Sequence, residues 1–95
     1  MTHGVIIVTI ARMGSVGNLV AAMANNPNNV RFSDACKVAT HYFGESRQDG
    51  TSHKVYKMPW KGDPRINLQS FKGKAKPYQV KQLLKAIEKL EGMQK

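Results

Sequence analysis

Gly50-Thr51-Ser52-His53-Lys54-Val55-Tyr56-Lys57 is the stretch from which the fold is best worked out. Asp49-Gly50, at its start, is the strongest two-residue hairpin signal in the chain, because this dipeptide favours the backbone angles of a tight turn. The residues from Thr51 to Met58 then favour a β-strand, and Pro59 ends it because proline cannot donate a hydrogen bond to a sheet. The predicted strand carries one histidine, His53, among lysines.

Two helices are predicted ahead of this strand by apolar residues spaced three and four positions apart. The first follows Ser15, which is a good N-cap. Its apolar face consists of Val16, Leu19, Val20 and Met23. The second spans about residues 33–42, with Ser33 as its N-cap and Gly44 as its stop.

Two more strands and a last helix complete the pattern. Phe43–Gln48 is predicted as a short strand leading into the turn, and residues 65–69 alternate so that Ile66 and Leu68 face the core. Residues 70–76 are predicted to form a basic loop. The last helix spans about residues 77–91 and stops at Gly92.

Together these elements predict an α+β domain of order α-β-β-β-α. Helices cover one face of a small three-stranded antiparallel sheet, and the other face is left to bind a partner. The domain occupies residues 31–95, and residues 1–30 form an N-terminal extension with an extra short helix. Under strict alternation His53 and Lys57 share one face of their strand, whereas Lys54 lies on the other.

The net charge of +9 is the strongest compositional signal. Residues 31–95 hold fourteen of the fifteen Lys and Arg and all six acids, which gives that part +8. From Lys54 to Lys76 the chain carries seven cations against Asp63 alone. Such a patch is an electrostatic footprint for a polyanion, and nucleic acid is the commonest partner of that kind.

Several classes of site are excluded by the residues present. The single cysteine, Cys36, rules out an internal disulfide and a cysteine-rich zinc site, and it favours a reducing, cytoplasmic location. Three scattered histidines do not make a metal site, and no glycine-rich phosphate loop is present, so no cofactor is expected. The apolar run at residues 4–11 is too short to span a membrane.

Four features between residues 31 and 90 follow the order known in one family. The first is a glycine-serine-histidine set, Gly50, Ser52 and His53, with Thr51 inserted. The second is the strand Lys54-Val55-Tyr56-Lys57 before Pro59. The third is the strand Arg65-Ile66-Asn67-Leu68, and the fourth is Gly73-Lys74-Ala75-Lys76 before the last helix. On these features the chain resembles the HicA toxins, the messenger-RNA interferases of bacterial toxin–antitoxin pairs. The resemblance implies a fold like that of double-stranded-RNA-binding domains, with His53 as the catalytic histidine. It also implies messenger RNA as substrate and a HicB-type antitoxin that covers the basic active face.

Metal-free RNA cleavage needs a base near the 2′-hydroxyl, cations around the phosphate and an acid for the leaving oxygen. Histidine suits the proton transfers, because its ordinary pKa of about 6.5 leaves both forms available near neutral pH. The cations stabilise charge that develops on the phosphate. The candidate substrate-binding residues are Gly50, Ser52, Lys54, Lys57, Arg65, Lys72, Lys74 and Lys76.

Two other functions fit the same residues. A non-catalytic RNA-binding module of this fold needs the basic segment but no role for His53. A pure interaction protein would use the basic face to bind an acidic protein. Trp60 and Tyr56 are equally compatible with stacking on bases and with filling the core.

Overall fold

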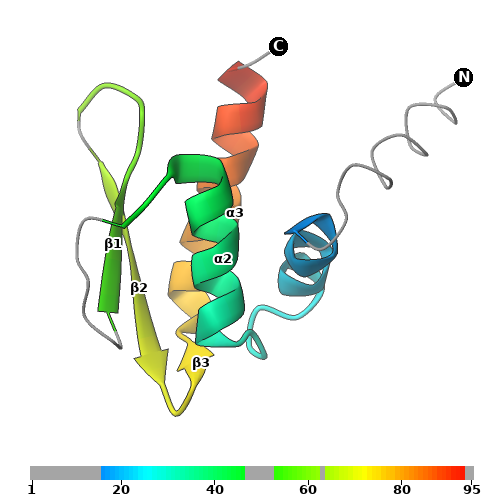
Figure 1. The fold of residues 1–95 in the computed structure, drawn as a ribbon. Coiled ribbons are helices and arrows are strands. Elements are labelled where there is room, and N and C mark those ends of the chain that lie inside the picture. The colour runs from blue at the N-terminus through cyan, green and yellow to red at the C-terminus, as the bar shows by residue number, and fades with distance from the viewer. Residues whose placement is uncertain (1–15, 47–52, 63, 94–95) are drawn as a thin grey trace, which may run out of the picture.

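The computed structural model describes residues 16–46, 53–62 and 64–93 of the chain. They form an α+β domain in which residues 16–25 are helical and precede α2 (Phe32–Phe43), β1 (His53–Lys57), β2 (Arg65–Phe71), β3 (Lys74–Ala75) and α3 (Pro77–Met93) (Figure 1). The strands make an antiparallel sheet of order β1-β2-β3. The predicted α+β class and the small three-stranded antiparallel sheet are confirmed.

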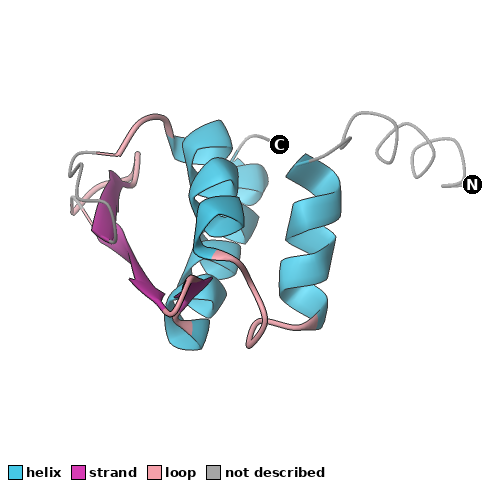
Figure 2. Ribbon diagram, turned by 60° about the horizontal axis from the view of Figure 1, so that its bottom comes forward, coloured by secondary structure: helices cyan, strands magenta, loops and turns pink. Residues whose placement is uncertain are grey.

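The described elements lie in layers. α2 and α3 pack against one face of the sheet, and helix 16–25 lies on their far side (Figures 1 and 2). Met23 of helix 16–25 is buried, and Val16, Leu19 and Val20 pack against the core, as the apolar spacing predicts. The second face of the sheet carries no described helix (Figure 2).

The burial of Tyr56 decides which side chains occupy that second face. Tyr56 is 1% exposed, and its partners across the ladder, Ile66 and the neighbouring Leu68, are buried with it. Alternation therefore turns the residues between these positions away from the helices. We call these residues the open face: His53, Val55 and Lys57 of β1, Arg65, Asn67, Gln69 and Phe71 of β2, and Lys74 of β3.

The third strand is not the one expected. The prediction of a strand over Phe43–Gln48 is wrong for its described part, since Phe43 closes α2 and residues 44–46 form no strand. The expected turn at Asp49-Gly50 lies outside the described residues. Instead, β3 forms inside the segment predicted as a basic loop. A two-residue turn makes this possible, because Lys72 (φ 54°) and Gly73 (φ 83°) both adopt the left-handed backbone that tight hairpins require.

Two helix ends also differ from expectation. α2 begins at Phe32 with Arg31 as its N-cap, so Ser33 is not the cap. Backbone pairing sets this start: Ala75 N–H donates to the Val30 carbonyl and Phe32 N–H to the Gly73 carbonyl, both at 2.9 Å, and these bonds align residues 30–32 with β3. α3 continues through Gly92 to Met93. The predicted stop of α2 at Gly44 is confirmed by its φ of 83° and its N–H bond to the Thr40 carbonyl.

Tyr56 is also the polar centre of the core. Its hydroxyl donates to the Cys36 carbonyl at 3.3 Å and lies 3.3 Å from Thr40 Oγ1, so both bonds tie β1 to α2. Burial is the main cause that raises the pKa of Tyr56 to about 12. The neutral hydroxyl is therefore the form that the folded chain holds.

We predict that Tyr56→Phe lowers the free energy of unfolding near neutral pH by about 1 kcal/mol, since it removes two long hydrogen bonds but keeps the ring. The raised pKa also has a consequence at alkaline pH. Between pH 10 and 12 the unfolded chain releases this proton first, so stability falls as pH rises through that window. Tyr56→Phe should flatten this fall in urea titrations, whereas Tyr78→Phe, at an exposed position, should not. An unchanged alkaline profile in Tyr56→Phe would contradict the assignment.

Candidate functional site

His53 is the first residue of β1, and it lies half-buried on the open face. The burial of Tyr56 puts Lys57 on the same face and Lys54 on the face toward the helices. Lys54 is close enough to Cys36 of α2 to favour its thiolate, although burial is the stronger influence and raises the pKa of that thiol. Of these two lysines, the structure therefore leaves only Lys57 on the face of His53.

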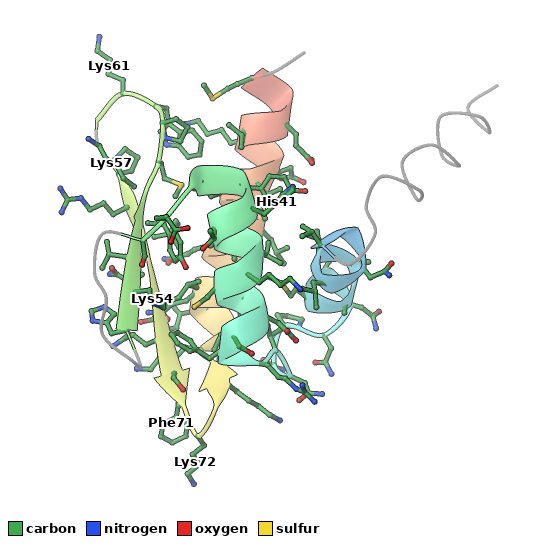
Figure 3. All side chains as sticks on the ribbon, viewed as in Figure 1. His41, Lys54, Lys57, Lys61, Phe71 and Lys72 are labelled. Atoms are coloured by element: carbon green, nitrogen blue, oxygen red, sulfur yellow. The ribbon has the colours of Figure 1, made fainter. Side chains whose placement is uncertain are left out.

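Lys57 and Arg65 lie at the far end of the open face from His53. They pair across the β1–β2 ladder, and Lys57 lies four positions along the strand from His53. At about 3.3 Å per residue this amounts to roughly 13 Å. Lys61 lies at the same end (Figure 3). The structure thus does not bring these predicted cations to the histidine.

A second group of cations lies at the end of the sheet where β1 begins. Lys72 and Lys74 are exposed on the β2–β3 hairpin, and Lys76 follows β3 half-buried. Figure 3 shows Lys72 and Phe71 at the opposite end of the sheet from Lys57 and Lys61. Phe71 is 62% exposed, and the Lys72 Nζ sits 5.4 Å from the centre of its ring. This end offers both an aromatic surface and positive charge.

The hairpin cations border a groove of about 580 Å³. Its lining combines apolar side chains with three lysines and holds no acid: Asn28, Phe71, Lys72, Lys74, Ala75, Lys76 and Pro77. A groove with this lining complements an anionic chain that also carries flat apolar rings. It lies beside the half of the open face that carries His53.

Gln69 and Gln79 form a hydrogen-bonded pair next to His53. Gln69 is the ladder partner of His53, and its backbone N–H donates to Gln79 Oε1 at 2.8 Å. Gln79 Nε2 in turn donates to Gln69 Oε1, also at 2.8 Å. Gln79 is 2% exposed, so its amide is buried.

The end of β3 explains why the backbone N–H of Gln69 needs a side-chain acceptor. A continuing ladder would offer the Lys76 carbonyl to Gln69, but that carbonyl accepts from the N–H groups of Gln79 and Val80 at the start of α3. Gln79 Oε1 takes the place of the Lys76 carbonyl as the acceptor for the Gln69 N–H. Sequence reasoning assigned Gln69 only an outward direction and Gln79 no role. The sequence signal that could have identified Gln79 is its spacing, since it is a polar residue four positions before Leu83 on the buried stripe of α3.

The remaining candidates divide between the core, the surface and the part of the chain that is not described. Gly50 and Ser52 lie outside the described residues. Tyr56 belongs to the core, so it is not a stacking surface. Trp60 is half-buried against Phe43, with the Lys89 Nζ 4.7 Å from its ring centre. His41 is exposed on α2, and no group of metal-binding side chains occurs among the described residues.

We predict that Gln79→Leu lowers the free energy of unfolding by about 1–3 kcal/mol. The substitution leaves the backbone N–H of Gln69 without its acceptor, and an unsatisfied buried donor carries a cost of this size. Gln82→Leu, at an exposed position on the same helix, should change stability by no more than about 0.5 kcal/mol. Equal effects of the two variants in urea unfolding would contradict the role of Gln79.

No family model, curated protein or solved structure matches this chain. None of the helices in the described part of the chain is both long and apolar enough to cross a bilayer.

Proposed function

We propose that the chain is a metal-independent endoribonuclease of the HicA type, with His53 as a general acid or base. The observation that carries the proposal is the position of His53 on the open face, beside Gln69 and at the same end as the basic β2–β3 hairpin. A histidine exposed to a bound chain can accept or donate a proton, which a histidine in the core cannot.

The reaction that fits this face is attack of the 2′-hydroxyl on the adjacent phosphorus. A base removes the hydroxyl proton, the P–O5′ bond breaks, and the leaving oxygen takes up a proton. The products are a 2′,3′-cyclic phosphate and a free 5′-hydroxyl. His53 supplies one of the two proton transfers, and positioned transfer of this kind accelerates reactions by roughly 10²–10⁴-fold.

Lys72, Lys74 and Lys76 are the cations that the proposal places around the substrate near His53. Lys57 and Arg65 act on the same chain further along, where they hold phosphates several ångströms from the reacting bond. The 13 Å span corresponds to two or more nucleotides of an extended strand. The substrate is therefore single-stranded messenger RNA lying along the open face.

A protein antitoxin and a cytoplasmic location belong to the same proposal. A face with many cations and no described helix over it is suited to an acidic partner that blocks the substrate. The partner proposed here is of the HicB type, because the sequence features resemble HicA.

The second candidate is an RNA-binding module of similar fold without catalysis. The observation that favours it is the spread of cations over both ends of the open face, rather than around His53 alone (Figure 3). Binding to phosphates along a strand needs no histidine. The two candidates differ only in what happens to the RNA after it is bound.

We predict that His53→Ala abolishes cleavage of messenger RNA in the presence of a chelator and leaves RNA binding within about threefold. A loss of at least about 10²-fold in rate is expected, because the proton transfer is removed. His41→Ala is the matched control, since it removes an exposed histidine on α2. Full cleavage by His53→Ala would refute the assignment, and binding without cleavage by the parent chain would favour the RNA-binding module.

We further predict that Lys72→Gln with Lys74→Gln weakens RNA binding and reduces its salt dependence. Each phosphate contact contributes about 0.7 to the slope of log K against log salt for single strands, so the pair should lower the slope by about 1.4. Lys81→Gln with Lys85→Gln removes the same charge from an exposed face of α3 and should change the slope little. Equal slopes for the two double variants, measured by fluorescence anisotropy, would mean that the hairpin is not a phosphate contact.

A further inference from the structure

We propose that Gln69 contacts the substrate, donating a hydrogen bond from its side-chain Nε2 to a phosphodiester oxygen held beside His53, and that Gln79 is the residue that orients it. This inference rests on the proposed ribonuclease function. It assigns a role to two uncharged residues outside the glycine-serine-histidine signature.

The direction of the Gln69 amide follows from one backbone group. A backbone N–H can only donate, so the atom of Gln79 that meets Gln69 N–H must be the oxygen. The other end of the Gln79 amide is then its NH2, which must find an acceptor. Its acceptors are Gln69 Oε1 at 2.8 Å and the Tyr78 hydroxyl at 3.3 Å, so the two N–H donors of Gln69 Nε2 point elsewhere. No partner for Gln69 Nε2 occurs among the described residues.

The register places the Cβ atom of Gln69 beside that of His53. Met58 N–H donates to the Pro64 carbonyl at 3.0 Å, which makes these two a hydrogen-bonded pair of the antiparallel ladder. Pairs alternate along such a ladder, so His53 and Gln69 form a non-hydrogen-bonded pair. Side chains of such pairs stand closest together, with Cβ atoms about 4.5–5.5 Å apart. The outward bond from Gln69 N–H to Gln79 agrees with this assignment.

A fixed amide at this place suits a phosphodiester in the transition state. Negative charge grows on the non-bridging oxygens as the 2′-oxygen attacks, and a preorganised donor stabilises that charge without having to reorient. Gln79 supplies the preorganisation, because its side chain is buried and makes two bonds of 2.8 Å to Gln69 at the sheet edge. Lys76, which follows β3 on the other side of Gln69, adds positive charge nearby.

Two variants test the donor and its orientation separately. Gln69→Met keeps the length of the side chain and removes the donors, and it should lower kcat for a short RNA about 10²-fold with little change in KM. Gln79→Glu cannot donate to Gln69 Oε1, so Gln69 must turn its NH2 toward the new carboxylate and present its oxygen to the substrate. It should lower kcat about as much while the chain stays folded. Gln82→Glu adds the same charge at an exposed position on α3 and should leave kcat within about twofold.

A binding readout without turnover completes the test. A 2′-deoxy oligonucleotide cannot be cleaved by 2′-hydroxyl attack, and on binding it should shift the Gln69 side-chain NH2 signals in ¹H–¹⁵N spectra of the parent chain. Gln69→Met identifies those signals by their loss. Normal kcat in Gln69→Met, or NH2 signals that do not move when the oligonucleotide binds, would overturn the inference while leaving His53 in place. Either no cleavage by the parent chain or full cleavage by His53→Ala would instead overturn the proposed function, and the inference with it.

Discussion

The burial of Tyr56 is the constraint on which the rest of the structure depends. A strand has two faces with a period of two, and one of them must be covered by the helices. Because the ring of Tyr56 is enclosed and its hydroxyl is bonded to α2, β1 has no freedom to turn over. The position of His53 on the uncovered face follows from this packing choice three residues away. The same packing puts Lys54 on the face toward the helices and Lys57 on the open face.

The candidate residues of the open face lie at its two ends rather than in one compact centre. One end joins His53 and Gln69 to the basic hairpin, and the other pairs Lys57 with Arg65. An enzyme that must hold a flexible chain benefits from contacts spaced along it, because binding at a distance from the reacting bond positions that bond. The separation of the two ends is therefore compatible with catalysis, although the same spacing would serve a binding module.

Much of the fold follows from local patterns, and the exceptions have physical reasons. The apolar stripe of α3, the alternation around Ile66 and Leu68 and the stop at Gly44 were all readable from the sequence, because each depends on neighbours close in the chain. β3 was not, because it needs a lysine in left-handed backbone at Lys72.

The candidate site was only partly readable for a related reason. His53 is conspicuous as a histidine among lysines. Alternation alone leaves two possibilities for its side chain, the face toward the helices or the open face. Choosing between them required knowing that Tyr56, rather than Val55, is in the core. The Gln69–Gln79 pair depends on where the β3 ladder stops and α3 starts, and that is a property of three-dimensional geometry.

The pairing of residues 30–32 with β3 has a consequence for how the chain folds. The β2–β3 hairpin closes a two-residue turn, and β1 meets β2 across a short loop, so both can form early from local contacts. The bond between Val30 and Ala75 joins residues about 45 positions apart, and closing so long a loop carries a larger entropic cost. We therefore expect the hairpins to form first and α2 to dock on them later, when the segment ahead of it joins the edge of β3.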